Sequence, residues 1–200
     1  MADLFNEKAE NWDSMPIPTQ LSKSIGPAII KQIDITQDMS VLDFGAGTGL
    51  LTSHIAPLVH DIAAVDISQS MLDKLVAKPE FHGKVKAYCQ NILQKPLDKK
   101  FDLIITAMAM HHVENTVMMI ESFADHLKSG GHIALADLDA EDGSFHPENT
   151  EGVFHLGFHR DDFKKILEDV GFIDIHFSTA YTVHKEGKSY PIFLVTAVKN

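Results

Sequence analysis

The stretch Val41–Leu51, with the sequence VLDFGAGTGLL, decides the fold of this 200-residue chain. It begins with an apolar run of high β propensity, and three glycines then occupy alternate positions. Apolar residues at helical spacing follow, so the pattern predicts a strand, a tight glycine turn and a helix from about Thr48 to Leu58. Glycine has no Cβ and tolerates positive φ, and the start of a helix presents free N–H groups. A nucleotide-like ligand is therefore expected against this turn.

The spacing of the glycines excludes the dinucleotide version of such a loop. That fingerprint places its third glycine three residues after the second, a position that Leu50 occupies here, and Asp43 would repel a diphosphate. The segment Asp43–Gly49 instead resembles the nucleotide-binding loop of class I S-adenosylmethionine-dependent methyltransferases. The resemblance implies a cofactor with an ammonium and a sulfonium group, for which Asp43 is a favourable neighbour. It makes cofactor-binding residues of Asp43, Gly45, Ala46, Gly47, Thr48 and Gly49.

A second apolar strand, Ile62–Asp66, ends in an acid about 20 residues beyond the glycines. A carboxylate at this spacing is expected to accept hydrogen bonds from ribose hydroxyls. The alternative is that Asp66 caps the next helix, but Ser68 is the better N-cap for the run that ends near Lys78. Ile67 and Met71 are expected beside the adenosine, although Met71 also suits the core.

The next two strands extend the resemblance. Val85–Cys89 is followed by Asn91, where the family commonly has an aspartate that accepts from the adenine amino group. The amide oxygen of Asn91 can also accept, with a simple turn as the alternative role, and Ile92 would stack on the ring. The buried strand Phe101–Thr106 leads through Ala107 and Met108, both assigned to the cofactor site, into a His-His pair that resembles the family's fourth motif.

The N-terminal residues 1–38 are interpreted as a helical lid. Helices are expected over residues 3–12 and from about Gln20 to Ile33. The segment Phe5–Asp13, FNEKAENWD, resembles the part of small class I methyltransferases that folds over the cofactor, with Trp12 in place of the commoner tyrosine. Core packing of Phe5 and Trp12 is the alternative.

The remaining elements complete an α/β pattern. A helix from about Glu114 to Leu127, closed by Lys128–Gly131, precedes a strand at His132–Leu138. A helix at Arg160–Val170, ended by Gly171, precedes a hairpin of Ile173–His184 and Tyr190–Val198. Strands that alternate with helices predict one domain, residues 1–200, with a doubly wound, mostly parallel sheet. The resemblance specifies a seven-stranded Rossmann-like methyltransferase fold with a C-terminal antiparallel hairpin.

The acceptor site is expected beyond strands four and five. Residues 139–159 are polar and long for a connection, which suits a substrate loop. The candidate catalytic residues are His111, His112 and His155, although methyl transfer need not use a base, and the two adjacent rings are expected to point in different directions. Asp137, Asp139 and His155 are a conceivable metal set. No compact ligand motif accompanies them, so no metal is predicted.

Composition limits the partners. The formal net charge of −11 argues against a nucleic-acid backbone. The N-terminus has no secretory pattern and no apolar run has transmembrane length, so a cytoplasmic protein without membrane contact is expected. The single cysteine, Cys89, excludes an internal disulfide and is predicted to be buried and inert. No oligomeric state is assigned.

The sequence hence favours an S-adenosylmethionine-dependent methyltransferase that acts on a small-molecule acceptor by in-line displacement. Alignment of the acceptor behind the methyl group lowers the activation barrier by roughly 7–11 kcal/mol. A general base accelerates a reaction by about 10²–10⁴-fold, which corresponds to less than about 6 kcal/mol. Two alternatives stay open. One is a non-catalytic S-adenosylmethionine-binding sensor or scaffold, and the less favoured one is a nicotinamide-dependent oxidoreductase on the same sheet.

Overall fold

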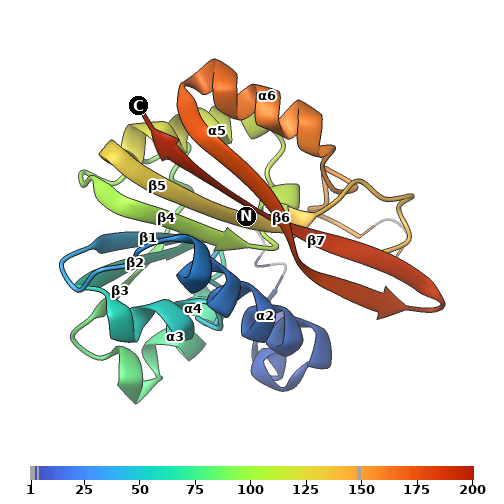
Figure 1. Cartoon of the computed structure of the whole chain (residues 1–200). Helices are drawn as coiled ribbons and strands as arrows, with labels where there is room; N and C mark the ends of the chain where they lie inside the picture. Colours follow the sequence, from blue (N-terminus) through green and yellow to red (C-terminus); the bar gives the residue numbers. More distant parts are fainter. Residues whose placement is uncertain (1–2, 4, 148–149) are drawn as a thin grey trace.

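A seven-stranded sheet runs through the centre of the molecule in the computed structural model, which describes residues 3, 5–147 and 150–200. The strand order is β3-β2-β1-β4-β5-β7-β6 (Figure 1). Neighbours among the first five strands are parallel, while β7 runs antiparallel to both β5 and β6, which confirms the predicted fold. The strands are β1 (Ser40–Phe44), β2 (Asp61–Asp66), β3 (Val85–Cys89), β4 (Phe101–Ala107), β5 (Leu127–Leu138), β6 (Phe172–Lys185) and β7 (Lys188–Lys199).

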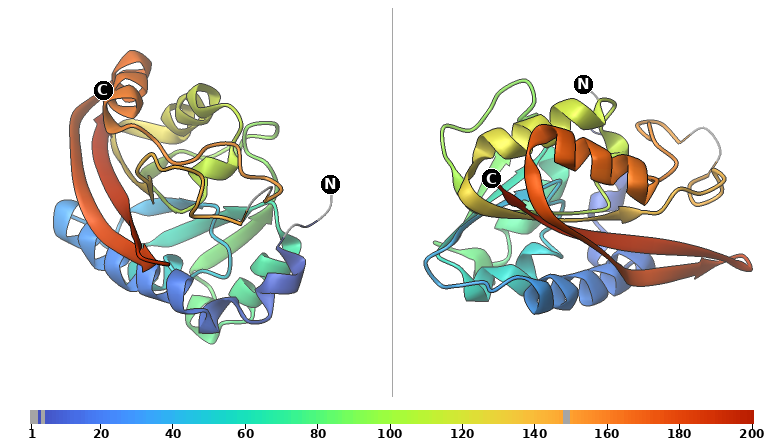
Figure 2. Two further views of the ribbon diagram at one scale, coloured as in Figure 1. Left: turned by 90° about the vertical axis from the view of Figure 1, so that its right-hand side faces the viewer. Right: turned by 45° about the horizontal axis from the view of Figure 1, so that its top comes forward.

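Helices cover both faces of the sheet (Figures 1 and 2). Helices α2, α3 and α4 bury their apolar sides on one face, and α5 and α6 do so on the other. The α-helices are α1 (Asn6–Ala9), α2 (Pro16–Gln32), α3 (Thr52–Ile55), α4 (Gln69–Val76), α5 (Thr116–His126) and α6 (Arg160–Val170), and the short 3-10 helices are η1 (Trp12–Ser14), η2 (Ala56–Leu58), η3 (Pro79–Phe81) and η4 (Met110–His112). None of the described helices is long and apolar enough to cross a bilayer.

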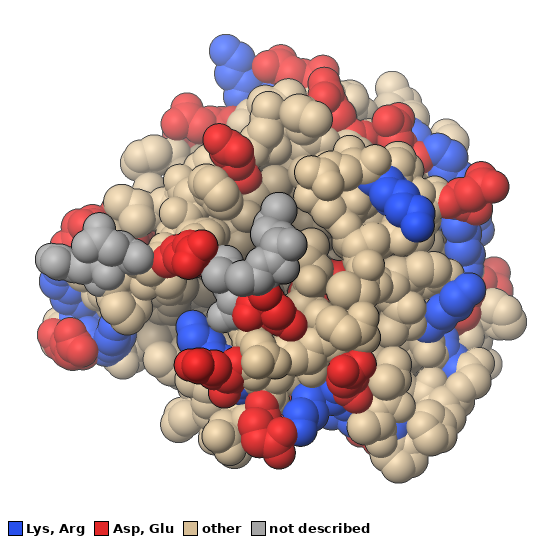
Figure 3. All heavy atoms as spheres, turned by 180° about the vertical axis from the view of Figure 1, so that it is seen from behind, with Lys and Arg blue, Asp and Glu red and all other residues tan. Residues whose placement is uncertain are grey.

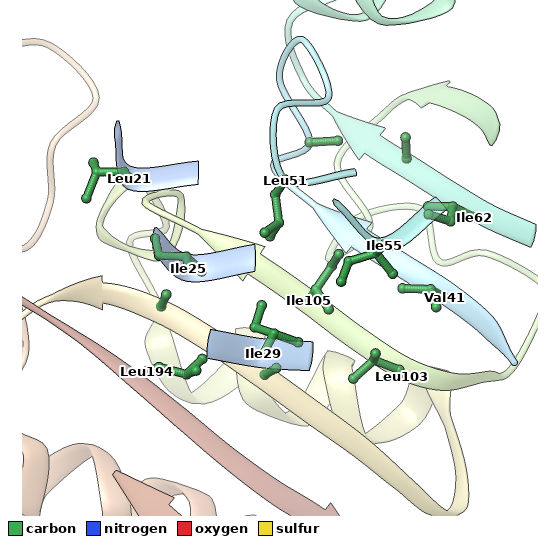
Figure 4. Packing of buried hydrophobic residues seen from close by; sticks show 14 of the residues in the cluster. Leu21, Ile25, Ile29, Val41, Leu51, Ile55, Ile62, Leu103, Ile105 and Leu194 are labelled. Carbon is green, nitrogen blue, oxygen red and sulfur yellow. The ribbon is translucent and has the colours of Figure 1, made fainter. Parts of the chain in front are cut away.

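Alternation along the central strands divides the core in two. In β1, Val41 belongs to the cluster under α2 and Leu42 to the cluster under α5, because successive side chains point to opposite faces. Figure 4 shows the first cluster, in which Leu21, Ile25 and Ile29 of α2 lie against the sheet. Because the central strands are packed on both faces, their ends are fixed in position and can support the loops that follow them.

The helix after the glycine turn is shorter than predicted. It begins at Thr52 rather than Thr48 and changes to a 3-10 turn at Ala56. Gly47 and Gly49 have φ of +55° and +84°, which are incompatible with a right-handed helix. The glycine turn therefore extends further into the chain than its apolar spacing indicates.

Other predicted boundaries also move. Helix α2 starts at Pro16 instead of Gln20, because proline is well suited to the first helical position. The predicted helix over residues 3–12 contains only α1 and part of η1 among the described residues. Helix α5 ends at His126, and Lys128–Gly131 is not its last turn but lies inside β5. The pairing of β5 with β4 shifts its register between Phe101 and Leu103. The glycine-rich segment of β5 accommodates this irregularity.

The expectation of a buried Cys89 is wrong. The residue is exposed, because β3 is the first strand of the sheet order and pairs with β2 alone among the described strands. Partial burial and nearby carboxylates, Asp66 first among them, raise the pKa of its thiol. The thiolate form is correspondingly disfavoured.

Several local predictions are confirmed. The Ser68 hydroxyl accepts a hydrogen bond from the backbone N–H of Met71 at 3.2 Å and caps α4. Gly171 ends α6 in the left-handed conformation with φ of +100°. The final hairpin forms with a turn at 186–187. Residues 1, 2 and 4 of the predicted lid, and 148 and 149 of the predicted substrate loop, lie outside the described residues.

Candidate active site

The candidate site lies at the carboxyl ends of the parallel strands. Strands β1 and β4 are neighbours, with β2 on the other side of β1, so the strand order reverses between β1 and β4. Ligands of open α/β sheets bind outside such a reversal. A surface hollow of about 540 Å³ between Ile30–Ile35 and Leu58 lies at the opposite edge, before β1 begins. It is therefore remote from the predicted residues.

The glycine turn exposes its backbone at one position and packs tightly at another. Gly45, Gly47 and Gly49 have φ of +67°, +55° and +84°. A Cβ on Gly45 would lie 2.3 Å from the Cβ of Ala109, whereas a Cβ on Gly47 would meet no described atom within 4 Å. Gly45 is thus required by packing, and Gly47 leaves open space beside the loop. The backbone N–H groups of Gly45 and Ala46 both donate to the carbonyl of Val65, at 2.9 and 3.0 Å.

Two carboxylates lie beside this turn, the buried one of Asp43 and the partly buried one of Asp66. Asp43 accepts a hydrogen bond from the Thr52 hydroxyl at 2.5 Å, and burial, followed by the charge of Asp66, raises the pKa of Asp43 to about 7. Asp66 accepts from the backbone N–H of Gly47 at 2.8 Å and of Ser68 at 2.8 Å. Burial raises the pKa of Asp66 as well. The two acids make the site electronegative, which favours a cationic or hydroxyl-bearing ligand.

The residues predicted to hold the adenosine have different surroundings. Ile67 is 59% exposed, whereas Met71 and Ile92 are buried in the core. The amide oxygen of Asn91 accepts from the backbone N–H of Leu93 at 2.9 Å, which is the turn role left open by the sequence. Its second lone pair stays available to a ligand. Ile67 is therefore the apolar side chain of this set that a ligand can reach.

The end of β4 is bent sharply toward the glycine turn. Met108 has φ of +58°, an unfavourable conformation for a residue with a Cβ, and its N–H donates to the carbonyl of Ala136 at 2.9 Å. Ala107, Met108 and Ala109 then lead directly into η4. The bend places Ala109 against Gly45, so the glycine turn and the histidine pair are close neighbours.

The N-terminal segment lies across the glycine turn and α4. Asp13 accepts from the Thr48 hydroxyl at 2.5 Å and pairs with Lys78, whose ammonium also donates to the Thr48 carbonyl at 2.8 Å. Trp12 is half-buried and contacts Phe5 edge to face, with ring centroids 6.0 Å apart. Phe5 also contacts His112 edge to face at 5.5 Å. The segment thus touches both the glycine turn and the histidines.

His111 forms a buried pair with Asp137 at the end of β5. Its Nδ1 is 2.7 Å from Oδ1 of Asp137, and the residues are 1% and 0% exposed. An ionised carboxylate only accepts, so Nδ1 carries the proton and Nε2 of the neutral ring is a base. Among the residues that the structure describes, Nε2 of His111 is buried and has no hydrogen-bond partner.

The adjacent rings do not point in different directions, contrary to expectation. The centroids of His111 and His112 are 4.2 Å apart, and His146 from the predicted substrate loop lies 5.0 Å from His111 and 6.2 Å from His112. His112 donates from Nδ1 to the carbonyl of Gly152 at 2.6 Å, which draws its ring toward the loop. Burial and neighbouring imidazoles lower the pKa of both His112 and His146 to about 4.

His155 and Asp139 have other partners. Nε2 of His155 donates to the carbonyl of Val113 at 2.9 Å, which ties the loop to the start of α5. Both carboxylate oxygens of Asp139 accept from Arg160 at 2.7 Å. In the described part of the chain no three His, Cys, Asp or Glu side chains are arranged to hold a metal.

Sequence reasoning missed three contributors to this region. Asp13 and Lys78 meet across 65 positions of the chain, and neither lies in a motif that would signal the contact. His146 lies in the predicted substrate loop, but no motif distinguishes it from the other polar residues of that loop. Its place beside His111 depends on Glu141, whose carboxylate accepts from the backbone N–H groups of Ser144 and Phe145 at 2.8 and 3.1 Å.

Comparison with known sequences identifies methyltransferases both in a family model and among individual relatives. Residues 20–176 match a family model described as a methyltransferase domain. The chain is 30% identical over 135 residues to an uncharacterised methyltransferase of Schizosaccharomyces pombe, covering 60% of this chain and 48% of that protein. It is 28% identical over 145 residues to the ubiquinone biosynthesis O-methyltransferase of Rickettsia canadensis, covering 68% and 61%. The chain thus spans less than two thirds of the length of these relatives.

Solved structures share the fold at lower identity. The magnesium protoporphyrin IX methyltransferase of Synechocystis, with bound S-adenosylhomocysteine, superposes with a TM-score of 0.72 at 20% identity, over 99% of this chain and 97% of that one. The N-methyltransferase NodS of Bradyrhizobium japonicum gives a TM-score of 0.74 at 14% identity, over 98% and 94%.

Proposed function

The chain belongs to the methyltransferase-domain family, and from this premise we propose that it transfers a methyl group from S-adenosylmethionine to a small-molecule acceptor. The observation that carries the proposal is the open backbone at Gly47 beside the buried carboxylate of Asp43 and the partly buried carboxylate of Asp66. These features lie where the strand order reverses. The acidic and basic side chains interspersed over the rear face (Figure 3), with a net charge of −11, favour a metabolite over a nucleic acid as the acceptor.

The residues present fit this cofactor. Asp66 keeps lone pairs for two ribose hydroxyls while the Gly47 and Ser68 N–H groups hold its carboxylate in place. Asp43 suits a cationic amino-acid moiety, because a cation beside it would relieve the desolvation of its charged form. Ile67 and Asn91 would border the adenine. Trp12, Ala46, Thr48 and Gly49 shape the cradle, while Met71, Ile92, Ala107 and Met108 support it from the core and the end of β4.

When bound, the sulfonium supplies an activated methyl group, so the hard part of the chemistry belongs to the cofactor. The protein has to exclude water and align the acceptor behind the methyl. Of the three predicted catalytic histidines, His111 presents an unpartnered base, His112 lies against its ring, and His155 anchors the loop through the Val113 carbonyl. We therefore propose His111 as the base where the acceptor needs one.

The two alternatives make different predictions. A sensor or scaffold would bind the cofactor without turnover. The buried Nε2 of His111, which has no partner among the described residues, argues against it, because an unpaired buried polar atom is costly without a function. A nicotinamide-dependent oxidoreductase is disfavoured by Asp43 directly below the turn. NADH binding would distinguish it.

The test is calorimetric titration with S-adenosylhomocysteine, using Asp66→Ala and Asn91→Ala as variants. Loss of two ribose hydrogen bonds should weaken binding by at least tenfold in Asp66→Ala, whereas Asn91→Ala should lose less. Circular dichroism at the same temperature checks that the variants are folded. Absence of S-adenosylhomocysteine binding to the wild-type protein at millimolar concentration would refute the proposal.

A further inference from the structure

We propose that His111, held by Asp137, forms with His146 the acceptor subsite of this chain, and that the subsite receives a neutral hydroxyl group. The inference rests on the proposed function and specifies the class of its substrate. His111 comes from η4, Asp137 from the end of β5 and His146 from the loop at 139–159, so three separate segments converge on one place.

Two buried nitrogens in this subsite have no hydrogen-bond partner among the described residues. They are Nε2 of His111 and Nε2 of His146. A buried polar atom without a partner is destabilising, and a native structure rarely retains one without a role. Since the Asp137 contact places the His111 proton on Nδ1, Nε2 of His111 is an acceptor. It therefore requires a group that donates.

The charge of Asp137 is already compensated, which disfavours an ammonium acceptor. Its Oδ2 accepts from the N–H groups of Met110 and His111 at 2.9 and 3.3 Å. Its Oδ1 accepts from Leu138 N–H at 2.8 Å and from the His111 ring at 2.7 Å. Four donors saturate this carboxylate, so it offers no free oxygen to a cation.

A carboxylate acceptor is also disfavoured. It would need a cation to offset its charge, and burial lowers the pKa of His146 and His112 to about 4, which keeps both rings neutral. Lys185 donates to the Phe145 carbonyl and Lys188 pairs with Asp142, so these lysines beside His146 are engaged elsewhere. Lys8, the remaining cation that acts on the imidazoles, lies over the ring of Phe5. A neutral hydroxyl satisfies the subsite best.

The subsite is connected both to solvent and to the cofactor loop. His146 borders a surface hollow of about 450 Å³, also lined by Asp142, Ser144 and Pro147. On the other side, Ala109, two residues before His111, is in contact with Gly45. An acceptor that enters beside His146 would thus be held next to the glycine turn.

The proton and electron balance is simple. The acceptor hydroxyl gives its proton to Nε2 of His111, its oxygen forms a bond to the methyl carbon, and the sulfur–carbon bond breaks with its electron pair on sulfur. The imidazolium is stabilised by Asp137 and releases the proton to water after the product leaves. Asp137 is a positioning residue in this scheme, because it sets the tautomer of His111 without touching the acceptor.

The first experiment needs no turnover. Long-range ¹⁵N–¹H spectra of the wild-type protein saturated with S-adenosylhomocysteine report which nitrogen of His111 carries the proton. Phenol, benzoate and benzylammonium are then titrated as fragments of similar size. We expect a proton on Nδ1, and perturbation of the His111 and His146 ring resonances by phenol at a concentration at least tenfold lower than by the two charged fragments. A proton on Nε2, a preference for either charged fragment, or no effect of any fragment would overturn the inference.

The second experiment measures methyl transfer to a panel of hydroxyl, carboxylate and amine compounds. His111→Gln should lower turnover of the accepted hydroxyl by 10²–10⁴-fold while the affinity for S-adenosylhomocysteine is unchanged. His176→Gln, on the exposed part of β6, is the matched control. Transfer only to carboxylates or amines, or full activity of His111→Gln, would contradict the subsite with the cofactor assignment intact. Failure of S-adenosylhomocysteine to bind would contradict the cofactor assignment, and the fragment titration of the free protein would still test the subsite.

Discussion

Alanine at Gly45 and alanine at Gly47 are expected to have separate effects, one on stability and one on ligand binding. Both residues have positive φ, which costs an L-residue about 1–2 kcal/mol, offset by about 0.4–1 kcal/mol because alanine restricts the unfolded chain. The Gly45 Cβ would also lie 2.3 Å from the Cβ of Ala109, and overpacking of this kind costs about 1–3 kcal/mol. Gly45→Ala should thus lose roughly 3 kcal/mol, and Gly47→Ala roughly 1 kcal/mol or less.

The assays are urea unfolding and calorimetry. With a urea dependence of about 1–3 kcal/mol per molar, the unfolding midpoint of Gly45→Ala should fall by about 1–3 M. Gly47→Ala should unfold close to wild type yet bind S-adenosylhomocysteine at least tenfold more weakly, because its methyl group enters the open space beside the turn. Equal stability of the two variants would refute the packing of Gly45 on Ala109. Wild-type affinity in Gly47→Ala would refute the position proposed for the ligand.

Three further predictions concern charge and backbone conformation. The pKa of Asp43 rises from 3.8 to about 7 on folding, so the folded state is stabilised by the protonated form. Between pH 4 and pH 8 the free energy of unfolding of the wild type should therefore fall by about 4 kcal/mol more than that of Asp43→Asn. Urea unfolding of both proteins at both pH values measures this difference. Lys78→Met removes the ion pair with Asp13 and the hydrogen bond to the Thr48 carbonyl, which together help to hold the N-terminal segment on the glycine turn. S-adenosylhomocysteine should therefore bind more weakly by calorimetry, with less than about 1 kcal/mol of stability lost. Gly171→Ala should cost about 1 kcal/mol in thermal unfolding, since φ of +100° is unfavourable with a Cβ although no atom obstructs it.

Each of these predictions has a result that contradicts it. A stability difference between wild type and Asp43→Asn that is independent of pH would mean that the carboxyl titrates normally. Unchanged affinity in Lys78→Met would show that the N-terminal segment acts independently of this ion pair. A loss above about 3 kcal/mol in Gly171→Ala would require a steric contact that the structure does not contain.

Local patterns were sufficient for much of the fold. The strand at Val41, the cap at Ser68 and the turn after α6 each depend on neighbouring residues, and all three are confirmed. The glycine turn was predicted, but its length was not, because apolar spacing does not reveal that Gly49 adopts positive φ. The sequence around Lys128–Gly131 has the composition of a helix end. Its incorporation into β5 depends on pairing with a distant strand.

The candidate site was predictable only in part for the same reason. The half proposed to hold the cofactor follows strand ends, and parallel strands bring those ends together. Its acceptor half depends on contacts between remote residues, such as His111 with His146. The wrong prediction for Cys89 has a similar cause. The sequence of a strand does not specify whether the strand lies at the end of the strand order, where β3 lies.

The position of β7 has a consequence for the order in which the sheet can form. This strand, which follows β6 along the chain, is nevertheless the one that pairs with β5, and β6 reaches the sheet only through it. During synthesis the parallel part would emerge first with β5 as an open edge, and residues Ile133–Ala136 are apolar and fully buried in the finished protein. Unpaired apolar edges of this type are sites of aggregation. Because β7 is the strand that covers β5, this edge is expected to stay open to self-association until the final hairpin has been synthesised.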